Sequence, residues 1–132
     1  MKPSILSPIT KLISLLLILV ITACSSDSTP RSTFIDDSSN PYEMHFVSDS
    51  KAYILRYGSP SIWIVDPSVS AADEENFKIG EINLGAYDDD GIPNMSTGLI
   101  SNNKLFVVMQ AMDSNYVPGD AYLSVMDMTT DT

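Results

Sequence analysis

A ten-residue pattern occurs twice in this sequence, as FVSDSKAYIL at positions 46–55 and as LISNNKLFVV at positions 99–108. Each copy has the end of an apolar run, three polar residues, a lysine and a second apolar run, and the copies lie 53 positions apart. Ser, Asp and Asn favour tight turns, whereas Val, Ile, Tyr and Phe favour strands. The pattern therefore predicts two hairpins of one kind, each with a three-residue polar turn.

The similarity between the two copies continues downstream. The segment Ile62–Asp66 matches Leu123–Asp127 at a separation of 61 positions, because the second copy has eight extra residues at Asp113–Asp120. A fixed pattern that recurs in this way indicates one structural unit used twice.

Short apolar runs bounded by turn residues predict an all-β fold of antiparallel sheets. Seven strands are expected, at Met44–Val47, Lys51–Tyr57, Ser61–Asp66, Phe77–Leu84, Thr97–Ile100, Lys104–Ala111 and Ala121–Asp127. Runs such as Ala52–Leu55 and Leu105–Met109 are apolar at consecutive positions. Because neighbouring side chains of a strand point to opposite faces, we expect both faces of these strands to be covered.

The repeated unit resembles the YVTN-type β-propeller repeat proteins of bacterial surfaces and periplasms. Their Tyr-Val-type strand corresponds to Tyr53-Ile54 and Phe106-Val107, and their Val-Ile-Asp-type strand ends correspond to Val65-Asp66 and Met126-Asp127. The resemblance spans about residues 44–132 and implies four-stranded antiparallel blades stacked face to face.

Propellers have roughly four to eight blades, and residues 41–132 supply about one and a half to two. The first unit has a further strand after Asp66, whereas five residues follow Asp127 in the second. We therefore expect an incomplete β-propeller and the N-terminal part of a longer protein. A small self-contained β-sandwich is the alternative.

The first residues have the layout of an export signal. Lys2 and Lys11 precede the apolar run 12–21, which is shorter than the roughly 20 residues needed to span a bilayer. The run ends in Ile21-Thr22-Ala23-Cys24, which resembles the lipobox of bacterial lipoproteins. That resemblance implies cleavage before Cys24 and acylation of this cysteine. The alternatives are an uncleaved anchor or an ordinary signal peptide cut near Ala23.

These features divide the chain into a signal peptide at 1–23, a lipidated flexible tether at 24–40 and the repeat region at 41–132. Ser25 follows the cysteine, and in lipoproteins of diderm bacteria this favours the outer membrane. We expect the domain to be held by its lipid anchor outside the cytoplasm, facing the periplasm or the cell surface.

The charge balance argues against nucleic acid as a partner. Two of the seven lysine and arginine residues lie in the signal region, so the rest carries five positive and seventeen negative side chains, a net charge of −12. Phosphate backbones require a basic surface.

One polar segment could bind a metal ion. Asp88, Asp90 and Asn94 place oxygen ligands around Gly91, as calcium prefers, but the bidentate Glu that completes an EF-hand loop is replaced by Leu99. A solvated acidic turn is the other interpretation. No other cofactor is expected.

The sequence predicts a binding or scaffold protein, with a protein or small ligand at the propeller loops. His45 is the only histidine and Cys24 is assigned to lipid, so neither a Cys/His zinc site nor a Ser-His-Asp triad is expected. An enzyme or redox accessory, with its catalytic residues in further blades, is the competing hypothesis.

Overall fold

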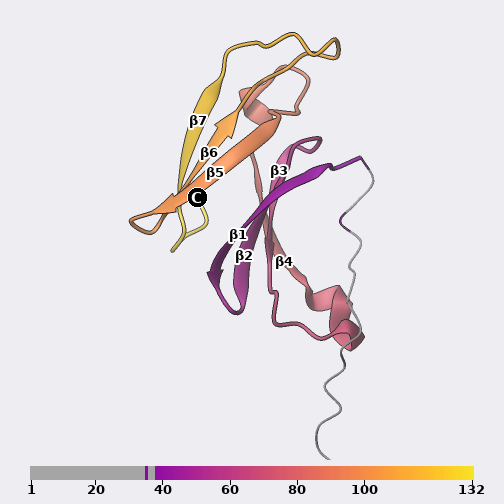
Figure 1. Cartoon of the computed structure of the whole chain (residues 1–132), viewed down its shortest axis with the longest axis vertical. Helices are drawn as coiled ribbons and strands as arrows, with labels where there is room; N and C mark the ends of the chain where they lie inside the picture. Colours follow the sequence, from indigo (N-terminus) through magenta and orange to yellow (C-terminus); the bar gives the residue numbers. More distant parts are fainter. Residues whose placement is uncertain (1–34, 36–37) are drawn as a thin grey trace, which may run out of the picture. The chain divides into compact units, whose positions relative to one another are not determined.

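The computed structural model describes residue 35 and residues 38–132, and it contains seven strands and two short 3₁₀ helices within them (Figure 1). The strands are β1 (Pro41–Ser48), β2 (Lys51–Arg56), β3 (Ser61–Val65), β4 (Lys78–Asn83), β5 (Met95–Ser101), β6 (Lys104–Met109) and β7 (Tyr122–Asp127). All seven predicted strands are confirmed, with ends that differ by a few residues. The helices η1 (Ala71–Asn76) and η2 (Gly85–Tyr87) were not predicted.

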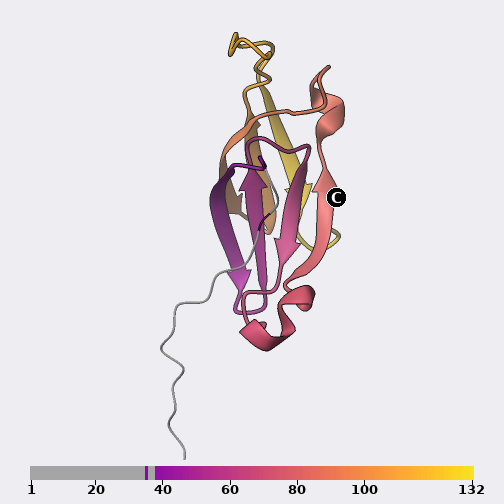
Figure 2. The same ribbon diagram turned by 90° about the vertical axis from the view of Figure 1, so that its right-hand side faces the viewer.

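The strands form two antiparallel sheets. The first has four strands in the order β1-β2-β3-β4 and the second has three in the order β5-β6-β7. Each strand therefore pairs with the strand next to it in sequence, and the all-β antiparallel prediction is confirmed. The two sheets lie face to face in the views of Figures 1 and 2, with β1 and β2 in contact with β5. Neither sheet closes on itself in the described part of the chain.

The strand ends follow the sequence repeat. Strands β1 and β5 end at Ser48 and Ser101, while β2 and β6 run over Lys51–Arg56 and Lys104–Met109, so all three pairs of bounds lie 53 positions apart. Strands β3 and β7 begin 61 positions apart. The two sheets are thus built from the same unit, except that the second has no fourth strand among the described residues.

The hairpin turns have two residues where three were predicted, because Ser48 and Ser101 pair with the lysines that begin the next strands. Asn102 and Asn103 have φ angles of 50° and 59°. Two left-handed residues are typical of the type I′ turn, whose twist matches the flanking strands. The first hairpin has no left-handed residue in its turn and instead shifts its register between Phe46 and Ser48.

The core lies between the sheets. Alternate side chains from both sheets form one buried cluster, which includes Tyr53, Leu55, Ile62, Ile64, Leu105, Val107, Met109 and Met126. Burial of each large apolar side chain stabilises the fold by about 1.5–3 kcal/mol. This cluster explains why the two units pack on each other.

The prediction that both faces are covered is confirmed for β2 only. On its second face Ala52 and Ile54 are buried beneath Ile35 and Phe77. On the second face of β6, Val108 is exposed and Phe106 half-buried, so for this strand the prediction was wrong within the described residues.

The chain segment before β1 contributes to this domain. Ser39 is buried, its hydroxyl donates to the Ile35 carbonyl at 2.7 Å, and its own carbonyl accepts a hydrogen bond from Gly58 at 2.9 Å. A Cβ atom at Gly58 would lie 2.3 Å from the Ser38 carbonyl oxygen, so this contact requires glycine. The predicted signal peptide and Cys24 lie outside the described residues. No helix within the described ranges is long and apolar enough to cross a membrane.

Candidate functional site

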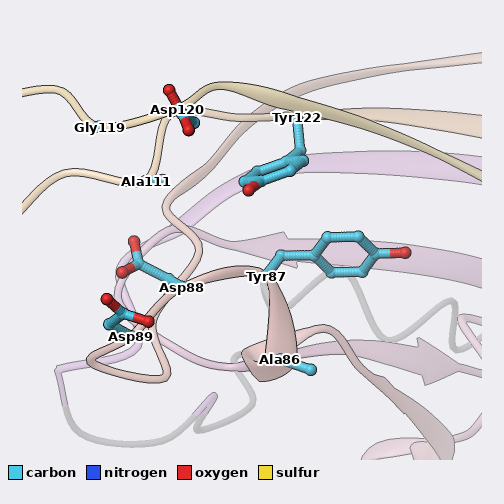
Figure 3. A pocket seen from close by; sticks show the side chains of 8 residues that line it. All are labelled: Ala86, Tyr87, Asp88, Asp89, Ala111, Gly119, Asp120 and Tyr122. Atoms are coloured by element: carbon cyan, nitrogen blue, oxygen red, sulfur yellow. The ribbon is translucent and has the colours of Figure 1, made fainter.

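A cleft of about 250 Å³ lies between two loops, residues 88–94 after η2 and residues 110–121 between β6 and β7 (Figure 3). Its lining consists of Ala86, Tyr87, Asp88, Asp89, Ala111, Gly119, Asp120 and Tyr122. A neighbouring hollow shares Asp88 and Asp89 and extends to Asp90 and Asp113. The two hollows therefore bring five aspartates from two loops to one region of the surface.

Direct hydrogen bonds join the two loops. The side-chain oxygen of Asn94 accepts a hydrogen bond from the Met112 amide at 2.7 Å, and its carbonyl accepts one from the Gln110 amide at 3.2 Å. Asn94 has a φ angle of 52°, a left-handed conformation that asparagine tolerates better than most residues. The buried Asn94 thus fixes the distance across the cleft.

The acidic turn is organised by its own side chains. The Oδ1 atom of Asp90 accepts a hydrogen bond from the Ile92 amide at 2.7 Å, and the Asp88 carbonyl accepts one from Gly91 at 3.0 Å. The Oδ2 atom of Asp88 is buried and has no hydrogen-bond donor among the described residues. Buried carboxylate oxygens usually have a partner, so this atom is the least satisfied polar group of the cleft wall.

The opposite loop contributes a carboxylate that its own backbone holds in place. The Oδ1 atom of Asp113 accepts hydrogen bonds from the amides of Val117 at 2.9 Å and Asn115 at 2.8 Å. These two bonds hold the pKa of Asp113 below its ordinary value. Asp113 is therefore negatively charged at neutral pH. Its two hydrogen bonds to backbone amides also fix the conformation of the loop that carries it.

Two tyrosines form one side of the cleft. The ring centroids of Tyr87 and Tyr122 lie 5.6 Å apart with an angle of 55° between the ring planes, and Figure 3 shows both rings beside the aspartates. Both side chains are exposed. Aromatic faces and carboxylates both attract cations, so this arrangement suits a ligand with a positively charged group.

The three predicted calcium residues have different positions. Asp88 lines the cleft and Asp90 the neighbouring hollow, whereas the side-chain oxygen of Asn94 is directed to the Met112 amide. Among the described residues, no three His, Cys, Asp or Glu side chains are placed to hold a metal ion. Calcium therefore stays a prediction that depends on Asp88 and Asp90.

His45 is packed between the sheets and is not part of the cleft lining. Its Nε2 atom lies 3.0 Å from the Oε2 atom of Glu43, which also accepts a hydrogen bond from the Gly98 amide at 2.9 Å. Burial alone would raise the pKa of Glu43, but these bonds and one from Thr97 hold it below the ordinary value. Glu43 and His45 thus join β1 to the edge of β5.

Sequence reasoning missed Asp113 and Asp120 as part of the site. They lie in the eight residues that the second unit has in addition to the first, and this insertion was the signal that could have identified them.

Comparisons with known proteins found no matching family, no matching curated protein and no matching solved structure.

Proposed function

We propose that this chain is a lipid-anchored protein outside the cytoplasm, with a propeller-like β domain that binds a protein or small ligand through its loops. The lipid is attached at Cys24, and the outer membrane is the favoured location. The acidic cleft carries the proposal of binding. Two of its eight lining residues, Gly119 and Asp120, come from the insertion that the first unit lacks. Because the first unit forms its sheet without this insertion, the inserted loop is available for recognition.

The order of the strands supports propeller-like units. Each sheet is a simple meander, as in a propeller blade, whereas small β-sandwiches are commonly connected as Greek keys. The contact of β1 and β2 with β5 also fits blades that stack face to face.

A role in binding is favoured over catalysis by the chemistry of the cleft. Its polar side chains are aspartates and tyrosines, and the residues that line it do not include His45. A ligand with a cationic group, such as a basic peptide or an amine, fits this lining best.

Fractionation of cells that express the full chain tests the anchor and its location. The protein is expected to stay with membranes after high-salt washing, to enter the detergent phase, and to be digested by protease added to cells with a permeabilised outer membrane. The Cys24→Ser variant is expected to accumulate as the larger, unprocessed precursor. A wild-type protein that salt releases, or a variant processed to the same size, would contradict the proposal.

A further inference from the structure

Two exposed apolar side chains lie on the side of the first sheet that points away from the second. Phe46 is 62% and Met44 is 40% exposed, and the pairing of β1 with β2 places them opposite Ala52 and Ile54. The half-buried Trp63 on β3 lies opposite Ile54 and continues the apolar surface. We call this side of the sheet, which faces the viewer in Figure 2, the Phe46 face.

The chain segment that precedes β1 joins the domain on this same face. Ile35 packs on the buried cluster that contains Ala52 and Ile54. Because these two residues pair with Phe46 and Met44, Ile35 lies on the side of the sheet that carries both exposed side chains. The N-terminal part of the chain therefore reaches the domain over the Phe46 face.

The proposed lipid attachment site is close to this point along the chain. Ile35 lies 11 positions after Cys24, and a fully extended chain of that length spans at most about 40 Å. A short tether of this kind gives the domain a high effective concentration at the membrane surface, so a weak contact is enough to dock it. The face on which the chain arrives is the one that reaches the lipid with the least extension of the tether.

We propose that the Phe46 face contacts the lipid bilayer beside the anchor, with Phe46 and Met44 inserted among the headgroups. The inference rests on the proposed acylation of Cys24. Apolar side chains at a membrane surface bind in proportion to the apolar area that they bury there. The contact would hold the domain in one orientation on the membrane.

The charges around this face indicate which lipid it fits. Lys78 is paired with Glu81 at 2.7 Å, so these two side chains add no net charge, and Arg56 is buried. The helix η1 carries three acidic residues and leads directly into Phe77, which packs on the same side of the sheet. Anionic lipid gives the membrane a negative surface potential, which repels acidic groups. We therefore expect the Phe46 face to contact zwitterionic lipid.

Fluorescence quenching in vesicles tests the contact. The full chain, purified from bacterial membranes, is placed in phosphatidylcholine vesicles that contain spin-labelled phosphatidylcholine, and a Phe46→Cys thiol carries the fluorophore. Acylation blocks the thiol of Cys24, so the introduced thiol is the only one labelled. Leu99→Cys is the matched control, because Leu99 is 63% exposed, lies on the edge strand β5 and points away from the core. Quenching should be severalfold stronger for Phe46→Cys than for Leu99→Cys.

A charge substitution tests whether the apolar side chains hold the face on the lipid. Adding Met44→Asp to Phe46→Cys should lower the docking equilibrium by about tenfold, measured as a loss of quenching, because it replaces an apolar side chain by a charged one. Val125→Asp is the matched control and should leave the quenching unchanged, since Val125 is 48% exposed on the edge strand β7 and gains the same charge. Replacing part of the phosphatidylcholine by phosphatidylglycerol should also lower the quenching.

The labelling separates failure of this proposal from failure of the anchor. A wild-type chain that takes up the fluorophore has a free Cys24 thiol, so the acylation would be wrong and the docking proposal would fall with it. An unlabelled wild type, together with equal quenching of Phe46→Cys and Leu99→Cys, would overturn the docking proposal alone. Stronger quenching of Leu99→Cys would also overturn it and would assign the lipid contact to the second sheet.

Discussion

The Nζ atom of Lys51 lies 2.8 Å from the Oδ1 atom of Asp131, although 80 positions separate these residues in the sequence. Lys51 begins β2 and also donates to the Met128 carbonyl at 3.0 Å, while Asp131 lies in the turn after β7 and accepts a hydrogen bond from the Tyr53 hydroxyl. One carboxylate thus joins the turn of the second sheet to two side chains of the first.

Replacing Asp131 is expected to destabilise the fold. Asp131→Ala leaves the half-buried Lys51 and the buried Tyr53 without their shared acceptor, so the free energy of unfolding should fall by about 1–3 kcal/mol in urea melts. Glu81→Ala breaks the exposed pair with Lys78 and serves as the matched control, with an expected loss below about 1 kcal/mol. Equal losses from the two variants would show that the Asp131 contact does not hold the sheets together.

The hydrogen bond between Tyr53 and Asp131 makes the free energy of unfolding depend on pH in the alkaline range. Burial, the hydrogen bond to Asp131 and the negative charges of Asp131 and Asp127 raise the pKa of Tyr53 above its ordinary value. The neutral hydroxyl therefore stabilises the fold fully below about pH 10, the pKa of an unfolded tyrosine, and the stabilisation is lost as the pH rises further. Tyr53→Phe should flatten the fall in unfolding free energy above pH 10, whereas Tyr116→Phe should not. If the unfolding free energy of the wild type and of Tyr53→Phe fell in parallel above pH 10, ionisation of Tyr53 would not be the cause of the fall.

The strands were predictable because their signals are local. Turn residues such as Asn102 and Asn103 bound apolar runs, and the repeat fixed the correspondence between the two units. The bond between Lys51 and Asp131 was not predictable, since it depends on how the sheets pack. The helix η1 escaped prediction because it consists of two short 3₁₀ pieces joined by a kink at Asp73, which have no apolar periodicity to reveal them.

Gly98 is expected to be intolerant of any side chain. A Cβ atom there would lie 2.7 Å from the Nε2 atom of His45 and 3.1 Å from a methyl group of Leu55. Gly98→Ala should lower the unfolding free energy by about 1–3 kcal/mol, and His45→Ala in the same chain should recover part of the loss. Gly80→Ala is the control, because its nearest atom is the flexible end of Ile64 at 3.3 Å. Additive losses for Gly98→Ala and His45→Ala would contradict the close contact.

A calcium titration decides the role of the acidic turn. If Asp88 and Asp90 bind the ion, millimolar calcium should raise the melting temperature by mass action, and Asp88→Asn with Asp90→Asn should abolish the rise. The control variant Asp49→Asn with Asp73→Asn removes the same amount of charge outside the acidic turn. It should keep the calcium-dependent rise in melting temperature. An unchanged melting temperature in the wild type would identify a solvated acidic turn.

Half of the candidate site could be found from sequence. A cluster such as Asp88 to Asp90 is visible in the sequence, but the position of Asp120 across the cleft follows from the bond between Asn94 and Met112, which only the folded chain shows. The environment of Asp88 Oδ2 likewise depends on burial by tertiary packing.

Mass spectrometry of the intact mature protein, purified from membranes in detergent, tests the lipid anchor most directly. The proposal predicts a chain that begins at Cys24 and carries the added mass of a diacylglycerol and a further acyl group on that residue. A mature chain that begins at any other residue, or one that begins at Cys24 without acyl mass, would contradict it.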